Sequence, residues 1–418
     1  MKWNTLLVSI LLAGLFLVGC TVKDSSLHGD NLPDKTECDH VAVAVPGTPP
    51  TCTEEGTEGR TVCSLCGESM ETSEVLPATG HNYKNNICTA CGLWGESVGL
   101  AFASNGDGTC TLVGRGTCTD DNICVPAISP EGEYVTHIGE NVFQGHKIPG
   151  VYLSDGIEVI EKGAFSNMKR LTALRLPDTL LSIGEGAFRN CVELKSITIP
   201  VGVDTISENA FYDCVKLELA VLPDGLIEIG NYAFRNCYEL VRADLPDSVR
   251  RIGVGAFEQC RALERMVIPE GVTVIEMTSF YYCMALKEVV LPESLQEIGF
   301  CAFDSCISLQ HVDIPDGVQK LEVHAFNACS GLQSLVLPDD VTTLKSIGYF
   351  RSLERVHIPV GVTSIMYGVF DDCPTLRQVC YGGTQEQWQA VTIDRKNSSN
   401  QILLDIQMIY NCDGSCAP

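Results

Sequence analysis

Apolar residues recur in the same order along most of the chain. The stretch from Val192 to Cys214, VELKSITIPVGVDTISENAFYDC, shows this order most clearly. Alternating apolar residues indicate a short strand that Pro200 ends, and two aliphatic residues continue the interior on the next limb. Ala210 and Phe211 then predict a brief helical turn that closes the loop. The inward positions of this unit are Leu194, Ile197, Ile199, Val203, Ile206 and Phe211.

The unit returns at a fixed step. Its aromatic residue and its proline each recur every 23 residues, over eight copies. A fixed step in this range is typical of stacked supersecondary units, each too small to bury its apolar face alone. We therefore predict a repeat solenoid of short parallel strands. The two series are Phe165, Phe188, Phe211, Phe234, Phe257, Phe280, Phe303 and Phe326, and Pro177, Pro200, Pro223, Pro246, Pro269, Pro292, Pro315 and Pro338.

Divergent segments flank these repeats. The alternating stretch around Asn105-Gly106-Asp107-Gly108 predicts a hairpin that covers the exposed end of the solenoid. Near the other end the step from Pro338 to Pro359 falls to 21 residues, and Tyr349 or Phe350 takes the aromatic place. We predict an N-terminal cap over 96–142, repeats over 143–376 and a C-terminal cap over 377–418.

One cysteine per unit forms a ladder through the repeats. As a small apolar residue, cysteine suits a crowded interior turn. Neighbouring rungs also lie within reach of a disulfide, but parallel side chains in consecutive coils argue against neat pairing. The ladder consists of Cys191, Cys214, Cys237, Cys260, Cys283, Cys306, Cys329 and Cys373.

The full unit resembles a known repeat. The pattern L-x-x-I-x-I-P-x-x-V-x-x-I-G-x-x-A-F-x-x-C, seen best in Leu171 to Cys191 and Leu286 to Cys306, is similar to the BspA-type leucine-rich repeat. The resemblance covers about Gly99 to Tyr410. It implies a curved solenoid on a bacterial cell surface, with a role in adhesion and contact with host or neighbouring-cell proteins.

Charge narrows the choice of partners. The chain carries 28 Lys and Arg against 53 Asp and Glu, a net charge of −25. Such a surface disfavours nucleic acid as a partner. Among the outward strand positions, Arg242 and Arg265 with Val267 and Val290 form a mixed basic and apolar group, which is a surface of the kind that partner proteins use. The simpler interpretation is that β-branched residues suit strands.

The sequence favours a binding protein over an enzyme. It contains no G-x-S-x-G, no H-E-x-x-H and no phosphate-binding glycine loop, so we expect neither catalysis nor a small-molecule substrate. The leading hypothesis is a surface protein whose solenoid binds other proteins. A glycan-binding surface scaffold is the alternative, although the outward rows hold few aromatic residues for stacking on sugars.

The N-terminus predicts export. Lys2 and the apolar run from Leu6 to Val18 are typical of a secretory signal, because the run is too short to span a bilayer comfortably. Its end, Leu17-Val18-Gly19-Cys20, resembles a bacterial lipobox, which implies cleavage after residue 19 and acylation of Cys20. The alternative is an ordinary cleaved signal. Residues 20–37 are then a flexible tether between the lipid anchor and the folded part.

Residues 38–95 are rich in metal-binding side chains. Two C-x-x-C pairs are each followed by glycine, which lets both thiolates of a pair reach one ion. A segment with so small a core can gain its fold from a metal. Eight potential ligands suffice for two tetrahedral structural zinc sites: Cys38, His40, Cys52, Cys63, Cys66, His81, Cys88 and Cys91.

The same segment resembles a small zinc-ribbon-like repeat of exported proteins from gut bacteria. The resemblance implies Cys52, Cys63, Cys66 and His81 as one ligand set, with Cys38, His40, Cys88 and Cys91 as remnants of flanking units. Disulfides are the alternative, because an exported chain meets an oxidising compartment. Four protein ligands would leave no open position, so such a zinc is structural.

Overall fold

The computed structural model describes residues 95–346, 348–371, 373–396 and 400–412, and farther toward the N-terminus only the backbone of six short strands. The chain divides into two compact units, Met1–Gly80 and His81–Pro418. Short antiparallel pairs occur in the first unit and at the start of the second. They are β1 (Ala42–Val45) with β3 (Arg60–Cys63), β2 (Gly56–Thr57) with β4 (Val75–Leu76), and β5 (Tyr83–Lys84) with β6 (Ile87–Cys88).

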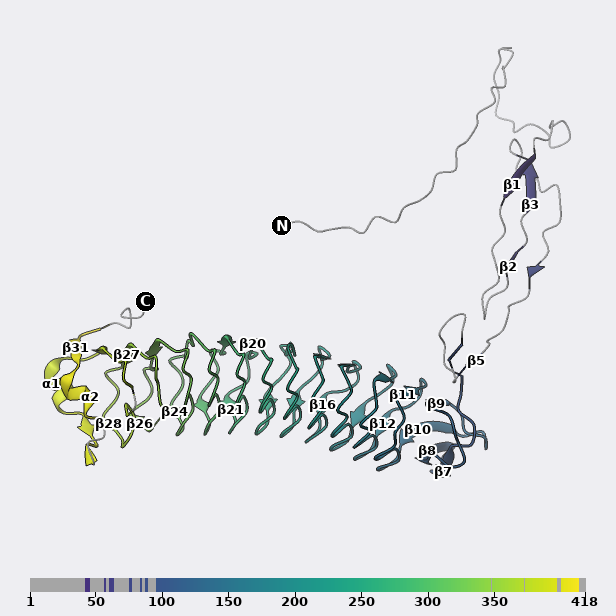
Figure 1. Ribbon diagram of the computed structural model, residues 1–418, viewed down its shortest axis with the longest axis horizontal. Helices are drawn as coiled ribbons and strands as arrows, with labels where there is room; N and C mark the ends of the chain where they lie inside the picture. The colour runs from purple at the N-terminus through teal and green to yellow at the C-terminus, as the bar shows by residue number, and fades with distance from the viewer. Residues whose placement is uncertain are drawn as a thin grey trace, which may run out of the picture. The chain divides into compact units, whose positions relative to one another are not determined.

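The second unit is a parallel β-solenoid of about 12 turns with little helix, as the repeat predicts. Each regular coil contributes one strand to each of two stacks, which run along opposite sides of the coils (Figure 1). Pairing joins each residue to the residue at the same repeat position, such as Ser196 to Leu219 and Ile183 to Ile206. The 23-residue step therefore sets the register of both stacks.

The first stack carries the strand that precedes the repeated proline. It is divided into four paired segments, and two of the three interruptions fall at the coils of Arg242 and His311, which make only single bridges, to Leu219 and Glu288. Its strands are β9 (Asn122–Val125), β11 (Gly150–Leu153), β13 (Ala173–Arg175), β15 (Ser196–Thr198), β17 (Leu219–Val221), β20 (Arg265–Val267), β22 (Glu288–Val290), β25 (Ser334–Val336), β27 (Arg355–Ile358), β29 (Gln378–Tyr381) and β31 (Gln407–Tyr410).

The second stack carries the strand after the proline. It begins at the N-terminal cap, where β8 (Thr109–Gly114) pairs in parallel with β10 (Tyr134–Ile138). The following strands are mostly two residues long. They are β12 (Val159–Ile160), β14 (Ser182–Ile183), β16 (Thr205–Ile206), β18 (Glu228–Ile229), β19 (Arg251–Ile252), β21 (Val274–Ile275), β23 (Glu297–Ile298), β24 (Lys320–Leu321), β26 (Thr343–Leu344), β28 (Ser364–Ile365) and β30 (Thr392–Ile393).

The predicted hairpin is present at the start of the solenoid. Strand β7 (Ala101–Ser104) pairs antiparallel with β8, and the turn between them uses Gly106 and Gly108 at φ 85° and 87°. These left-handed values are easily reached only by glycine. Buried Cys110 and Leu112 on β8 begin the core. The antiparallel strand therefore covers the edge of the parallel stack.

The repeated phenylalanines form one continuous stack through the core. Neighbouring rings from Phe143 to Phe326 lie 5.1–5.6 Å apart, centroid to centroid, and most pairs are nearly parallel. The rings are fully buried. Such a column lets each coil bury its largest side chain against its neighbours, which a single coil could not do.

The segment around each phenylalanine is a turn, where the sequence predicts a brief helix. Asn209 and Asp213 on either side of Phe211 adopt left-handed φ values of 56° and 59°, which interrupt any helix. The amides of Asn209, Phe211 and Asp213 instead donate to carbonyls of the next coil, at 2.8–2.9 Å. We call the side of the solenoid formed by these turns the turn edge.

The cysteine ladder lies buried beside the phenylalanine stack. Each thiol from Cys191 to Cys329 donates to the carbonyl of the phenylalanine one coil earlier, at Sγ–O distances of 3.1–3.3 Å. The cysteines from Cys191 to Cys329 are free thiols in this structure. These seven thiols therefore belong to the packed core of the solenoid.

The C-terminal coils depart from the regular repeat. In the shortened coil, Phe350 takes the buried position and Tyr349 is exposed. The chain ends in two short helices, α1 (Gln385–Gln389) and α2 (Ile402–Asp405), and in β31, which completes the first stack. The ring of Trp388 packs 5.0 Å from that of Tyr381. No helix within the described ranges is long and apolar enough to cross a membrane.

Candidate protein-interaction surface

The outward side of the first stack is a surface on which the coils differ from one another. In strands such as β15, β17, β20 and β22 the middle residue is buried and the residues on either side are exposed. This alternation follows from the two-residue period of a strand. Repetition fixes the inward residue, so the outward rows are free to carry partner-specific chemistry. We call this side the strand face.

All four predicted partner-binding residues lie on the strand face. Arg265 and Val267 are on β20, and Val290 is on β22, directly paired with Val267. Arg242 lies one coil earlier, bridged to Leu219 of β17. Val267 and Val290 are each 39% exposed. The structure therefore brings the four residues together across consecutive coils.

The two arginines are already paired with carboxylates. Arg242 Nε donates to Asp244 Oδ2 at 2.5 Å, and Arg265 Nε donates to Glu288 Oε2 at 3.0 Å. Both pairs are well exposed, so they add little to stability. Their effect is on the surface itself, because each cation is balanced by a neighbouring anion. The sequence predicts a mixed basic and apolar surface at these four residues, whereas in the structure the surface is close to neutral.

Three further aliphatic side chains extend this surface. Leu219, Val221 and Val241 are 40%, 44% and 50% exposed, in the coils before Arg265. The row pattern already places Leu219 and Val221 outward, whereas Val241 lies one position before the rows. We define the central patch as the exposed side chains of Leu219, Val221, Val241, Arg242, Arg265, Val267 and Val290.

Ion pairs between neighbouring coils surround the central patch. Lys195 pairs with Glu218 at 3.5 Å, and Lys287 pairs with Glu264 at 3.1 Å. An apolar centre with a polar, charge-compensated rim is the usual composition of a protein–protein interface. The patch stands out because the chain as a whole is strongly acidic.

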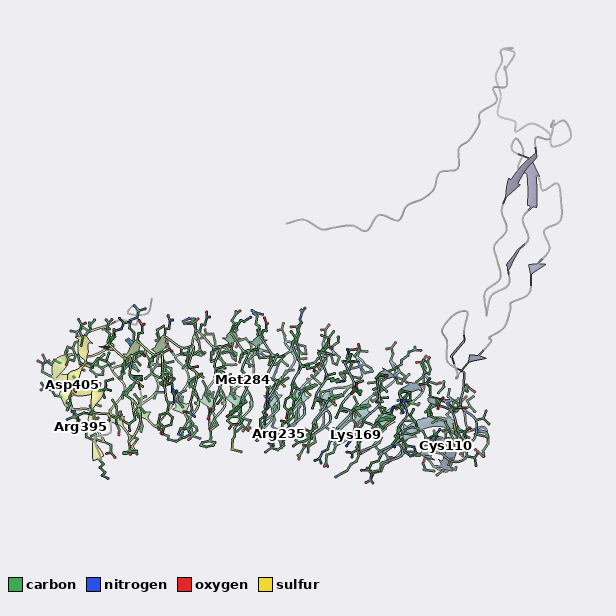
Figure 2. The ribbon with its side chains drawn as sticks, in the orientation of Figure 1. Cys110, Lys169, Arg235, Met284, Arg395 and Asp405 are labelled. Atoms are coloured by element: carbon green, nitrogen blue, oxygen red, sulfur yellow. The ribbon has the colours of Figure 1, made fainter. Side chains whose placement is uncertain are left out.

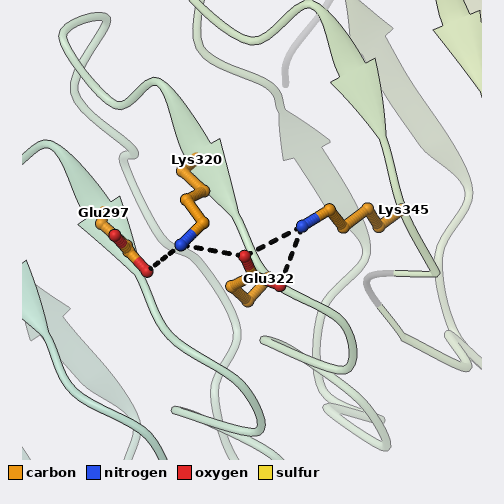
Figure 3. Close-up of polar contacts among 4 residues, drawn as sticks. All are labelled: Glu297, Lys320, Glu322 and Lys345. Atoms are coloured by element: carbon orange, nitrogen blue, oxygen red, sulfur yellow. Dashed lines mark hydrogen bonds and ion pairs between the residues drawn. The ribbon is translucent and has the colours of Figure 1, made fainter.

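The second stack is charged where the strand face is apolar. Figure 3 shows a chain of alternating charges in which Lys320 Nζ lies 2.7 Å from Glu297 and 3.1 Å from Glu322, and Lys345 lies 2.9 Å from Glu322. Hydrogen bonds from Lys345 and Lys320 lower the pKa of the Glu322 carboxyl, and bonds to Glu297 and Glu322 raise the pKa of Lys320. These charged side chains are already paired with one another, so the second stack has fewer free charges for a partner protein to bind.

Comparison with known families agrees with the coil geometry. A family model described as the BspA type leucine-rich repeat region, six copies, matches residues 136–264 and 251–377, more than half of the chain. The chain belongs to the BspA-type leucine-rich repeat family. This family model describes a repeat region and no enzyme. A search of curated proteins gave no match.

Several solved bacterial proteins are similar to this BspA-type chain. A leucine-rich cell surface protein from Faecalibacterium prausnitzii A2-165 is 27% identical, with 72% of this chain and 97% of that chain covered and a TM-score of 0.41. A leucine-rich repeat protein from Bacteroides ovatus is 21% identical over 75% and 98%, with a TM-score of 0.45. The pneumococcal vaccine antigen PcpA is 19% identical over 79% and 98%, with a TM-score of 0.47.

The turn edge of this BspA-type solenoid carries a polar groove near its N-terminal end. The groove has a volume of about 410 Å³, and Gly163 and Gly186 occupy positions where other coils carry larger side chains. Ser166 is 5% exposed, and its Oγ has no hydrogen-bond partner among the described residues. Amide side chains supply much of the remaining lining: Asn141, Gln144, Asn167, Asn190 and Asn209.

Farther along the turn edge, charged and aromatic side chains stack on one another. Arg235, labelled in Figure 2, lies 5.6 Å from the centroid of the Tyr212 ring and 3.0 Å from Glu258. Burial raises the pKa of Glu258 despite this partner. Arg189, which comes from the preceding coil, lies 4.9 Å from the centroid of the same Tyr212 ring. Aromatic residues that are scarce on the strand face thus gather on the turn edge.

The predicted lipidation and zinc sites lie outside the residues described in full. This holds for Cys20 and for six of the eight neck ligands. For Cys63, at the end of β3, and Cys88, at the end of β6, only the backbone is described. Structural zinc in the neck therefore stays a prediction. The six other ligands are Cys38, His40, Cys52, Cys66, His81 and Cys91.

Proposed function

We propose that this chain is a non-catalytic binding protein that recognises an extracellular protein through the central patch. The observation that carries the proposal is a row of exposed aliphatic side chains across consecutive strands, surrounded by ion pairs in an otherwise acidic protein. Contiguous apolar surface of this kind is characteristic of interaction sites. Membership of a repeat family with surface-protein relatives supports the same function.

The geometry suits a flat partner surface. Strands stack about 4.8 Å apart, so the coils from Leu219 to Val290 extend over roughly 15 Å. A standard interface buries about 800 Å² on each partner, more than these side chains alone provide. We therefore place the apolar anchors in the central patch and the polar rim in the surrounding ion pairs.

The proposed partner is outside the cell because we propose that the chain is exported and anchored by lipid at Cys20. The signal-like N-terminus and its lipobox-like end support this assignment. We expect a Cys20→Ser chain to leave the membrane fraction and appear in the medium. Equal membrane retention of the variant and the natural chain would remove the lipid anchor from the account.

We propose that the neck, residues 38–95, is stabilised by structural zinc and separates the solenoid from the membrane. We expect metal analysis of the purified mature chain to find at least one zinc per chain, and Cys63→Ser with Cys66→Ser to remove zinc. Unchanged zinc in that double variant would contradict the ligand assignment. Less than one zinc per chain would favour disulfides in this segment.

The binding proposal is tested with paired variants of the full mature chain. Val267→Asp with Val290→Asp places two carboxylates in the centre of the patch. Ile227→Asp, an equally exposed aliphatic residue beside β18 of the second stack, is the matched control. In a pull-down from surface and matrix proteins, we expect the natural chain and the Ile227→Asp control to capture the same partner. The double variant should no longer capture it. Retention by all three would exclude the central patch.

The polar groove favours a second candidate function, carbohydrate binding. An unpaired buried hydroxyl and a lining of amides suit a neutral polyhydroxylated ligand, because sugars offer donors and acceptors together. Gly186→Asn would fill the groove with a residue that tolerates its left-handed φ of 58°. A glycan array should give signal with the natural chain and none with this variant. No signal from the natural chain would exclude the glycan function.

A further inference from the structure

We infer that Cys301, Asp304 and His324 form a binding site for a divalent transition metal such as Zn²⁺ on the turn edge of the solenoid. This site is separate from the zinc ligands predicted in the neck. Its three ligand atoms, the thiol sulfur, a carboxylate oxygen and an imidazole nitrogen, all lie within 4.8 Å of one another. Within the described part of the chain this is the one cluster with such a set of side chains.

The repeat itself brings the three side chains together. Cys301 and His324 occupy the same position, two residues before the repeated phenylalanine, in consecutive coils. Stacking the coils places equivalent side chains one strand spacing apart, about 4.8 Å. Asp304 follows Cys301 by one turn and faces the same gap. The ligands thus come from two coils that are already held by backbone hydrogen bonds.

The backbone at this position is unfavourable for cysteine and histidine. Cys301 and His324 adopt left-handed φ values of 52° and 61°. Every coil from Gly163 to His324 is left-handed at this position, with Tyr232 and Thr278 there as well as glycine and asparagine, so the strain belongs to the repeat. What is particular to Cys301 and His324 is that two successive coils carry metal-ligating side chains at this position.

Asp304 is a buried carboxylate without a cation. It is 6% exposed and accepts hydrogen bonds from Ser305 Oγ at 2.7 Å and Asn327 Nδ2 at 2.9 Å. No Lys or Arg among the described residues lies within ion-pair distance of it. Glu258, at the equivalent position two coils earlier, is paired with Arg235 at 3.0 Å. A bound metal ion would supply the missing positive charge, and the two hydrogen bonds would orient the carboxylate.

The environment of the thiol fits a ligand better than a nucleophile. Cys301 is 7% exposed. Its sulfur lies within 4.8 Å of the ligand atoms of Asp304 and His324. A metal ion would displace the proton of this shielded thiol.

The ligand set defines the class of ion. Thiolate and imidazole favour Zn²⁺, Co²⁺, Ni²⁺ or Cu²⁺ over Mg²⁺ and Ca²⁺, which prefer oxygen. Three protein ligands leave one tetrahedral position for water. The rings of Phe300 and Tyr349 lie 6.1 Å and 6.0 Å from that of His324, and both are partly exposed. They give the site an aromatic rim.

The test uses Co²⁺ as the probe on the full mature chain under reducing conditions. Cys301→Gly and His324→Asn introduce residues that other coils carry at this position, so both chains should fold at least as well without metal. His311→Gln, an exposed histidine on the strand face, is the control. All chains retain the neck, so its contribution cancels in the comparison.

We expect the natural chain and the control to bind one Co²⁺ more than either variant, with a corresponding loss of thiolate-to-cobalt absorbance in the Cys301→Gly chain. Any Co²⁺ affinity that remains at this site in either variant should be lower than in the natural chain by at least about tenfold. Equal cobalt stoichiometry in natural and variant chains would overturn the proposal. An equal rise in thermal midpoint with Co²⁺ in natural and His324→Asn chains would overturn it independently.

Discussion

At the scale of single residues, the cysteines do more than fill space. Each thiol from Cys191 to Cys329 gives a hydrogen bond to a phenylalanine carbonyl one coil earlier, so two coils share one interaction. Without the thiol, that carbonyl would be buried with a weaker set of partners. The same residue therefore packs the core and connects neighbouring coils.

Removal of one rung should weaken the solenoid measurably. Cys237→Ala takes away the donor to Phe211 and leaves a small void, so we expect the free energy of unfolding to fall by about 1–3 kcal/mol. Urea unfolding followed by circular dichroism measures the change. Ser196→Ala, exposed on β15, is the control and should change stability by less than about 0.5 kcal/mol. Equal stability of the two variants would contradict the role given to the ladder.

The buried thiols also predict how stability depends on pH. Burial raises the pKa of Cys191 from 9.0 to about 12. Because the unfolded chain loses this proton first, the contribution is complete below pH 9 and is lost as pH rises toward 12. The free energy of unfolding should therefore fall more steeply between pH 8.5 and about 10.5 in the natural chain than in Cys191→Ala. Parallel pH profiles would show that this thiol is not the titrating group.

Much of the residue level could be predicted from the sequence, because the period fixes which side chains point inward. The burial of Phe211 and Cys214 follows from it. The thiol hydrogen bonds do not, since they depend on the carbonyl of a different coil. The repeated apolar pattern does not indicate the site at Cys301 and His324 for a related reason, because Cys301 lies outside the cysteine ladder. The two residues share a position only in the variable column two residues before each phenylalanine.

At the scale of the coil, the strands form where the repeat predicts them, and two of the three interruptions in the first stack have a local cause. The coils at Arg242 and His311 make single bridges in the first stack. Both place aspartate two residues later, where Asp244 pairs with Arg242 and Asp313 lies 2.7 Å from His311. Aspartate is a poor strand former, and these pairs run along one coil instead of between coils.

Replacing that aspartate should extend the sheet. In Asp244→Thr we expect pairing between β17 and β20 to continue through residues 242–244, with a gain in stability of up to about 1 kcal/mol. Hydrogen exchange of the amides in this coil measures the effect directly, and their exchange should slow. Asp247→Thr, in the turn that follows, keeps the change in charge but adds no strand. Equal exchange in both variants would assign the interruption to another cause.

The turn edge shows what the apolar pattern could not predict. The sequence predicts a brief helical turn at Ala210 and Phe211, where the chain closes the loop of each coil. The left-handed residues at Asn209 and Asp213 arise from hydrogen bonding to the next coil, a contact that no single unit specifies. The same geometry creates the polar groove at Gly163 and Gly186 and the metal cluster at Cys301.

At the scale of the whole molecule, the solenoid presents chemically different sides. The strand face carries the central patch, the second stack carries self-paired charges, and the turn edge carries ligand-type side chains. The sequence could predict the strand face, since its rows follow from the period. It could not predict that Arg242 and Arg265 are neutralised, because one partner lies on the same coil and the other on the next.

This difference between sides underlies the central claim, that recognition takes place on the strand face. The claim is most directly tested by the dissociation constant of the identified partner for the natural chain, for Val267→Asp and for Ile227→Asp. A carboxylate buried without a partner should weaken binding about 10- to 100-fold in Val267→Asp, because it costs at least 1–3 kcal/mol. Ile227→Asp should bind like the natural chain. Equal dissociation constants for all three would contradict the account, and weaker binding by Ile227→Asp alone would move the interface to the second stack.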